Sequence, residues 1–172
     1  DARANQSYKA VNNLINGGVD VYRISNVVNG AAFSNGSFYI ASNTKAKSII
    51  DKTAAENNVQ FIAVDQKPAA LSKIKKARIA LWDTYGGSMP SGWVRLILEK
   101  FDYTFDVIYP KDIDTGNLRS KYDVIVFVGG AIPAVGSGVN TNAGFGFNNP
   151  NPDSIPVEYR NRLGRITAAK SI

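Results

Sequence analysis

Three short apolar runs, with one amphipathic segment between the first two, constrain the fold of this chain more than any other feature. The runs cover residues 77–82, 105–109 and 123–128, and the amphipathic segment covers residues 90–101. An apolar run of this length is typical of a buried strand, and the spacing in 90–101 is typical of a helix. Strand, helix and strand in this order form the unit of parallel sheets. The sequence therefore predicts an α/β fold in this part of the chain.

The amphipathic segment predicts a helix with a broad apolar face. Proline at position 90 suits the first turn of that helix, because the N–H group that proline lacks has no intrahelical partner there. Apolar residues recur three and four positions apart, as on one side of an α-helix. They are Trp93, Val94, Leu96, Ile97, Leu98 and Phe101.

The first part of the chain predicts a smaller α/β unit. Apolar residues at helical spacing predict a helix over residues 5–16. The runs 19–24 and 36–41 are strand-like and flank a turn-rich segment, which predicts a hairpin. A second helix is expected after the hairpin, with Asn43 or Thr44 as its cap.

Residues 59–64, with the sequence VQFIAV, predict a third strand of this unit, because β-branched and aromatic residues are frequent in them. An order of helix, two strands, helix and strand leaves a place for a further strand upstream of residue 1. The small unit then covers residues 1–67. Residues 68–76 are expected to form a linker, since they combine a proline with several lysines. The larger domain covers residues 77–172.

The end of the larger domain has a different composition. Residues 131–152 are rich in glycine, asparagine and proline, and a loop of this length in a compact domain is typical of a functional or mobile segment. Two helical pieces are expected after it, broken at Gly164 and capped by Ser154 and Thr167.

The residue types that the chain lacks exclude several kinds of catalytic site. It contains neither cysteine nor histidine, so zinc sites built from these residues are excluded within it, as are Ser-His-Asp and Cys-His catalysis. No apolar run approaches the roughly 20 residues of a membrane-spanning helix, which predicts the absence of a membrane span.

The formal net charge of +6 raises the question of nucleic-acid binding. The dense basic cluster consists of Lys73, Lys75, Lys76 and Arg78. No aromatic residue interleaves with it, as stacking on bases would require. We therefore interpret the cluster as a solvated segment before a strand, and we expect no nucleic-acid partner.

Two glycine-containing loops are the candidate ligand-binding elements, because ligands of open parallel sheets bind at the carboxyl ends of the strands. The loop at 83–88 follows the first strand of the larger domain, and residues 129–131 follow the third. Paired glycines let a backbone approach a ligand and present N–H groups to an anion, although the same pairs also make simple tight turns. The candidate ligand-binding residues are Asp83, Tyr85, Gly86, Gly87, Gly129 and Gly130.

Catalytic chemistry has little support in these loops. The sequence pattern shows no partner base for Asp83. Asp83 can therefore be interpreted either as a residue that fixes its own loop or as a ligand-binding residue. The glycine motifs of dinucleotide-binding and P-loop proteins are absent. We predict no catalytic residue and no metal ligand within the chain.

The same region resembles a known family. Residues 92–109 (GWVRLILEKFDYTFDVIY), 112–126 (DIDTGNLRSKYDVIV) and 154–166 (SIPVEYRNRLGRI) are similar to a class I glutamine amidotransferase-like domain, which has a flavodoxin-like fold. In bacterial M14 zinc carboxypeptidase-like proteins this domain follows the catalytic domain. The first unit, from SYKAVNNLINGGVDVYRI to VQFIAV, resembles the segment that precedes that domain. The resemblance therefore covers nearly the whole chain.

The resemblance implies a flavodoxin-like sheet that lacks its last strands. Gly129 and Gly130 match by position the glycines that help to form the family's oxyanion hole. The nucleophilic cysteine of true amidotransferases would come after residue 172, so no catalytic residue carries over. The zinc of a peptidase would be bound in an upstream domain of the same chain.

The resemblance also implies a setting for this chain. We expect it to be part of a longer protein that is extracellular or periplasmic. Its upstream peptidase domain would be a partner within the same chain. The open edge of an incomplete sheet would either form a homodimer or be covered by residues 131–172.

The function that these points imply is a non-catalytic accessory domain, which supports the upstream peptidase domain or binds its substrate. One alternative is a sensor that binds a small ligand at the carboxyl ends of the strands. The other is a degenerate amidotransferase-like hydrolase that uses Ser88 or Asp83. A peptide or a small molecule is the expected ligand.

Overall fold

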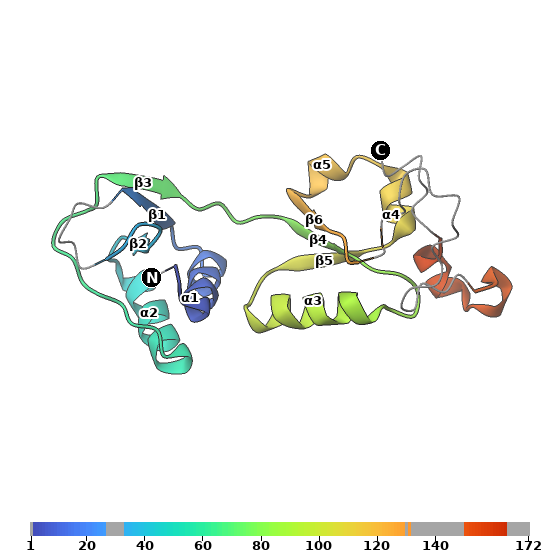
Figure 1. Ribbon diagram of the computed structural model, residues 1–172, viewed down its shortest axis with the longest axis horizontal. Helices are drawn as coiled ribbons and strands as arrows, with labels where there is room; N and C mark the ends of the chain where they lie inside the picture. Colours follow the sequence, from blue (N-terminus) through green and yellow to red (C-terminus); the bar gives the residue numbers. More distant parts are fainter. Residues whose placement is uncertain (1, 27–32, 130, 132–149, 165–172) are drawn as a thin grey trace. The chain divides into compact units, whose positions relative to one another are not determined.

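The computed structural model describes residues 2–26, 33–129, 131 and 150–164. The chain divides into two compact units (Figure 1). Unit 1 comprises Asp1–Lys76 together with Lys100–Tyr103, and unit 2 comprises Ala77–Glu99 and Thr104–Ile172. The main division therefore falls between Lys76 and Ala77, at the start of the predicted larger domain.

Unit 1 contains a three-stranded antiparallel sheet with the order β2-β1-β3. Its strands are β1 (Val21–Asn26), β2 (Phe38–Ile40) and β3 (Ala70–Lys73). β1 pairs with β2 with Tyr22 opposite Tyr39, so the predicted hairpin is confirmed. The other neighbour of β1 is β3, which pairs with it in antiparallel orientation.

Two of the sequence predictions for unit 1 need correction. The strand predicted at 59–64 is wrong, because these residues form no strand and the third strand of the sheet is β3. The expected linker at 68–76 contains that strand, so four of its nine residues belong to the sheet. The local pattern favours VQFIAV, but the register of the central strand selects ALSK instead.

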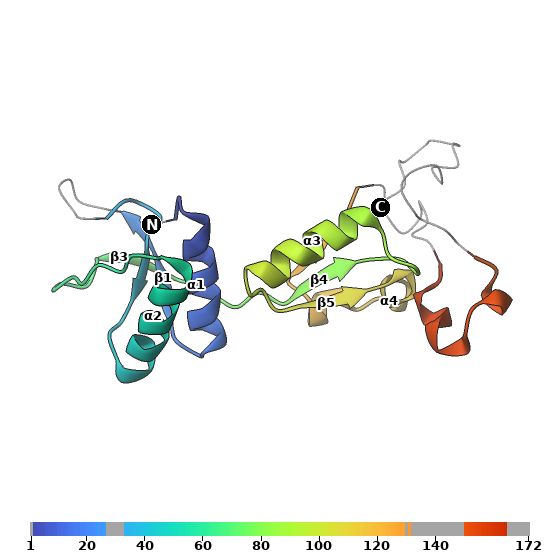
Figure 2. The same ribbon diagram turned by 90° about the horizontal axis from the view of Figure 1, so that it is seen from below.

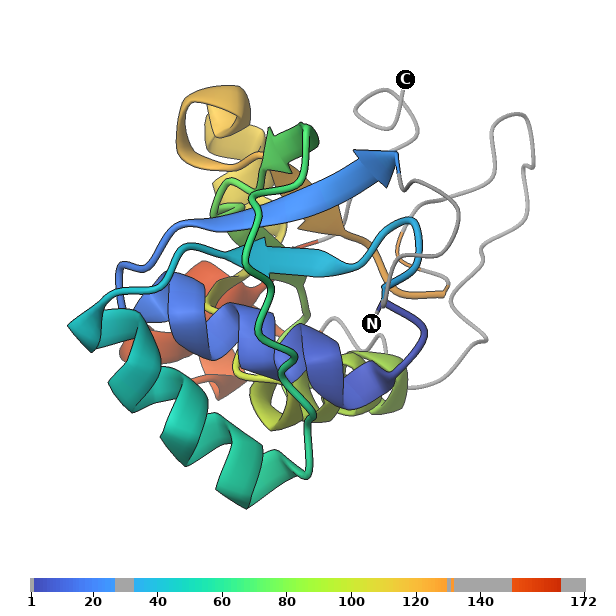
Figure 3. The same cartoon turned by 90° about the vertical axis from the view of Figure 1, so that its left-hand side faces the viewer.

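Two helices pack beside this sheet (Figure 3). They are α1 (Asn5–Asn16) and α2 (Thr44–Asn57), and both were predicted. The side chain of Asn43 caps α2, since its oxygen accepts a hydrogen bond from the Ala46 backbone N–H at 2.8 Å. The buried core of the unit joins α1, the sheet and α2 through Val11, Leu14, Val19, Val21 and Ala46.

Unit 2 contains a three-stranded parallel sheet with the order β5-β4-β6. The strands are β4 (Ile79–Trp82), β5 (Phe105–Ile108) and β6 (Val124–Val126), close to the three predicted apolar runs. The predicted α/β class with a parallel sheet is therefore confirmed. β4 lies in the centre, and its residues Ala80, Leu81 and Trp82 are buried, as expected for a strand covered on both faces.

The helix α3 (Met89–Lys100) connects β4 to β5 and lies along one side of the sheet (Figure 2). Val94 packs against the core of unit 2. The rest of the predicted apolar face is only partly used, because Trp93, Leu96 and Ile97 are 62%, 51% and 54% exposed. Three of the six apolar residues of this predicted face are therefore exposed.

The connection from β5 to β6 contains two short helices, α4 (Pro110–Thr115) and α5 (Leu118–Lys121). It crosses the side of the sheet opposite α3 (Figure 1), as right-handed crossovers in opposite directions require. At the start of the sheet, the Arg78 side chain donates to the Asp123 carboxylate at 2.8 and 3.1 Å. This ion pair joins the first residues of the β4 and β6 segments.

Residues 150–164 differ from their prediction. Two short 3₁₀ helices, η1 (Pro152–Ser154) and η2 (Val157–Arg162), stand where one α-helical piece was expected. Ser154 lies inside η1, and the side chain of Asn151 caps it. The second predicted piece, with Thr167, lies outside the described residues.

The 3₁₀ segment is held on unit 2 by basic side chains. Arg162 lies over the Tyr109 ring, with its guanidinium carbon 5.3 Å from the ring centre. Lys111 donates from its Nζ to the Arg160 carbonyl at 2.9 Å.

Across the described part of the chain, every helix is too short or too polar to cross a membrane.

Replacing the central core leucine of unit 2 should destabilise that unit strongly. Leu81 is fully buried in β4, so Leu81→Ala is expected to lower the free energy of unfolding by about 2–5 kcal/mol. Leu96→Ala, on the exposed side of α3, should cost less than about 1 kcal/mol. Urea titration followed by tryptophan fluorescence measures unit 2, since Trp82 and Trp93 both belong to it. Equal losses in the two variants would contradict the packing of β4.

Removing the cap of α2 should weaken unit 1 locally. Asn43→Ala is expected to cost about 0.5–2 kcal/mol, because the Ala46 N–H loses its acceptor. Asn43→Asp keeps an acceptor oxygen and should preserve most of the stability. Amide hydrogen exchange along α2 measures the effect. Equal exchange in the alanine and aspartate variants would rule out the cap as the cause.

Candidate functional site

The candidate loops of unit 2 begin at the same edge of the sheet. β4 and β6 are adjacent and parallel, with Leu81 opposite Val126. The loop that starts at Asp83 and the residues that follow β6 therefore leave the sheet side by side. This arrangement agrees with the expected position of a ligand site in an open parallel sheet.

The side chain of Asp83 fixes its own loop. Its Oδ1 accepts a hydrogen bond from the Thr84 backbone N–H at 2.8 Å. The Asp83 backbone N–H donates to the Ile108 carbonyl at 2.9 Å, and the Gly87 N–H donates to the Thr84 carbonyl at 2.9 Å. These bonds hold a tight turn, so the loop-fixing role is the one for which the described contacts give support.

The glycines of this loop are required by its backbone. Gly86 and Gly87 have φ angles of +83° and +74°, in the left-handed region that favours glycine. Gly129, after β6, is exposed, and a side chain there would meet no atom within 4 Å. Gly130 lies outside the described residues, so the predicted pair of oxyanion-binding glycines stays a prediction. Tyr85 is half-buried.

Ser88 is used by the helix that follows it. Its Oγ accepts a hydrogen bond from the Ser91 backbone N–H at 3.2 Å, and its carbonyl accepts from the Gly92 N–H at 2.9 Å. Ser88 thus caps α3, and its side chain is buried. A hydroxyl in this role is poorly placed as a nucleophile, which argues against the degenerate hydrolase.

The resemblance assigns its zinc to an upstream domain and predicts no metal ligand within this chain. No group of three Asp or Glu side chains able to hold a metal occurs in the described ranges.

Two members of the predicted basic cluster have acidic partners, since Lys73 pairs with Asp20 at 2.7 Å and Arg78 with Asp123. Hydrogen bonding to Asp123 raises the pKa of Arg78. The cluster is therefore partly neutralised by neighbouring carboxylates.

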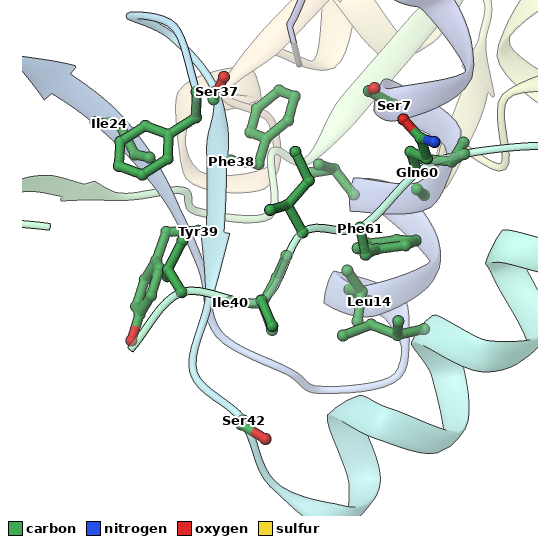
Figure 4. Close-up of a pocket in the computed structure, with 18 of the residues that line it drawn as sticks. Ser7, Leu14, Ile24, Ser37, Phe38, Tyr39, Ile40, Ser42, Gln60 and Phe61 are labelled. Carbon is green, nitrogen blue, oxygen red and sulfur yellow. The ribbon is translucent and has the colours of Figure 1, made fainter. Parts of the chain in front are cut away.

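A cavity of about 820 Å³ lies in unit 1, which the sequence did not indicate. Leu14 of α1, Ile40 of β2 and Phe61 of the connection after α2 lie around it (Figure 4). Its remaining described apolar lining consists of Ala10, Val11, Ile24, Phe33, Phe38, Tyr39, Ile50, Val59, Ile62, Ala63, Val64 and Pro68. None of the six residues predicted to bind a ligand is among them.

Polar groups are few in this cavity. Ser7 and Ser37 are buried and line it, and the Ser37 hydroxyl lies 3.4 Å from that of Ser34. Lys47 and Asp51 also line it and form an ion pair at 2.8 Å. The other polar lining residues are Arg3, Ser42 and Gln60. An apolar wall with a few hydroxyl, amide and charged groups is typical of a ligand pocket.

The cavity was not predicted, because the sequence assigns the residues of each of its walls to the core or to the sheet. The apolar residues of α1 and β2 read as core, and residues 59–64 read as a strand of the sheet. Because 59–64 lies outside the sheet, the space beside it stays open. The useful signal was the surplus of strand-like sequence in a small unit.

Comparisons of this chain with protein-family models, curated proteins and solved structures give no match.

Two glycine-to-alanine changes in unit 2 should act in opposite directions. Gly87→Ala places a side chain at φ +74° and is expected to cost about 1–2 kcal/mol. Gly92→Ala lies in α3, with no atom within 4 Å of the new Cβ, and should stabilise by about 0.4–1 kcal/mol. Tryptophan fluorescence in urea measures both. A neutral Gly87→Ala would show that the turn does not require glycine.

Proposed function

We propose that this chain is a non-catalytic accessory module that binds polypeptide substrate for a zinc carboxypeptidase-like protein. The cavity of unit 1 carries the proposal, because it has the size and the lining of a binding pocket. The resemblance of residues 92–109 and 112–126 to the domain that follows M14 catalytic domains supplies the setting. The same resemblance makes the proposed location extracellular or periplasmic.

The cavity suits the side chains of a peptide. Its volume of about 820 Å³ lies within the usual range for small-molecule and cofactor sites, roughly 300–1,000 Å³. Apolar walls favour apolar side chains, since each buried CH₂ group gains about 0.8 kcal/mol. The hydroxyl groups of Ser7 and Ser37 and the amide of Gln60 offer hydrogen bonds to a peptide backbone.

Charge favours a ligand that carries negative groups. Residues 1–76 contain ten Lys or Arg and five Asp or Glu, so this half holds most of the net charge of +6. A carboxypeptidase substrate has a free terminal carboxylate in addition to its acidic side chains. Long-range attraction to a basic unit would raise the rate at which such chains associate.

The contacts in unit 2 support a non-catalytic role. The Asp83 carboxylate accepts from a backbone N–H within its own turn, and the Ser88 hydroxyl caps α3. Neither has a neighbouring base in the described contacts, and the chain contains no histidine or cysteine. We propose that unit 2 is an incomplete flavodoxin-like sheet of the amidotransferase type, for which the parallel order β5-β4-β6 is a coarse support.

Blocking the cavity should abolish peptide binding. A short fluorescein-labelled peptide of alternating valine and glutamate residues is the probe, and fluorescence polarisation measures its Kd. Ala63→Trp fills the space from an exposed lining position and is expected to raise Kd at least about tenfold, a loss of about 1.4 kcal/mol. Ala69→Trp is the matched control, because Ala69 is exposed and does not line the cavity. Its Kd should stay within about twofold of the unaltered chain.

Three results would overturn the proposal. They are the absence of peptide binding by the unaltered chain, an equal loss in the two tryptophan variants, and peptidase or amidase activity of the purified chain. Asp83→Asn tests the candidate loops of unit 2, at 83–88 and 129–131, separately from the cavity of unit 1. A loss of binding in this variant alone would move the site to the carboxyl ends of the parallel strands.

A further inference from the structure

The connection between α2 and β3 has the sequence of a strand but not the pairing of one. Residues 59–64 read VQFIAV, a run rich in β-branched and aromatic side chains. None of them belongs to a strand, and within the described part of the chain none makes a backbone–backbone hydrogen bond. Figure 3 shows this stretch as part of the coil that rises from the end of α2 to β3.

Its side chains alternate between half-buried and exposed from Val59 to Ile62, and residues 62–64 are all exposed. Val59 and Phe61 are half-buried, and Phe61 packs against the core of unit 1. Ile62 and Val64 are 61% and 39% exposed. An exposed apolar segment with unpaired backbone groups is a template for pairing with another chain, and no charge or proline within 59–64 opposes such pairing.

We propose that residues 59–64 accept an extended acidic peptide as an added β-strand, an inference that rests on the proposed function and specifies how the polypeptide is held. All residues from Val59 to Val64 line the cavity of unit 1. A chain that pairs along them therefore places alternate side chains over the cavity. Figure 4 shows Phe61 of this segment next to Leu14 of α1. In strand addition the backbone bonds provide affinity and the pocket provides selectivity.

Charge complementarity selects an acidic partner. Arg3 and Lys47 line the cavity, and Asp51 is its one acidic lining residue among those described. The Lys47 ammonium lies 2.8 Å from the Asp51 carboxylate, so this pair is internally balanced. Residues 1–76 contain ten Lys or Arg and five Asp or Glu, so the unit that holds the cavity is basic. A peptide that alternates apolar and acidic residues directs its apolar side to the cavity and its charges to this surface.

The position of peptide N-methyl groups tests strand pairing directly. In a paired strand, alternate N–H groups point to the partner strand and the others point away. Two versions of the fluorescein-labelled valine–glutamate peptide are therefore compared, one methylated on the valine nitrogens and one on the glutamate nitrogens. With the full chain, one version is expected to bind at least about tenfold more weakly than the unmethylated peptide and the other to stay within about threefold.

A second measurement locates the contact. Binding of the unmethylated peptide should slow amide exchange at alternate residues within 60–64, whereas amides of β5 in unit 2 should be unchanged. A valine–lysine peptide of the same length should bind at least about tenfold more weakly, because its charges repel the basic unit.

The outcomes separate the inference from the proposed function. Equal binding of the two methylated peptides, or unchanged exchange at residues 60–64 in the bound state, would overturn strand addition while peptide binding stands. Equal binding of the valine–lysine peptide would overturn the acidic preference. If no version of the peptide binds, both the strand addition and the proposed function fail.

Discussion

Backbone pairing of one central strand organises each unit of this protein. β1 has a partner on both sides in unit 1, and β4 has a partner on both sides in unit 2. Leaving the N–H and C=O groups of a buried strand unpaired would cost several kcal/mol of folding free energy. Both edges of β1 and β4 must therefore be paired, and this requirement limits where any site can lie. The helices then follow, because each sheet must cover its apolar face. The segments that pair with these two strands therefore determine where the candidate loops of unit 2 and the cavity of unit 1 lie.

The sequence predicted the elements whose signals are local. The spacing in α1, the Asn43 cap and the fully apolar run of β4 depend on neighbouring residues, and each agrees with the structure. Prediction failed where two segments competed for one partner. VQFIAV has the stronger strand composition, yet ALSK pairs with β1. A register along β1 is a non-local property, and propensity contributes at most about 1 kcal/mol per residue to it.

The same distinction explains the candidate sites. Gly86 and Gly87 could be assigned to a turn, and the positive φ angles agree with that interpretation. The use of Asp83 and Ser88 as internal acceptors could not be read from the sequence, because it depends on where Thr84 and Ser91 direct their N–H groups. The cavity could not be read either, since it arises from a segment that the pattern assigned to the sheet. The failed local prediction at 59–64 thus coincides with one wall of the cavity.

Unit 1 and unit 2 use their surplus apolar residues differently. In unit 2 the exposed side chains of Trp93, Leu96 and Ile97 lie on a regular helix whose backbone groups are already paired, so another chain could meet them only through side-chain packing. In unit 1 the exposed Ile62 and Val64 lie on a segment whose backbone N–H and C=O groups make no backbone–backbone hydrogen bond within the described residues. Packing alone discriminates weakly between apolar partners, whereas backbone pairing demands an extended chain in a fixed register. The connection at 59–64 would therefore be the more selective of the two surfaces, and selectivity for extended chains is what the proposed function requires.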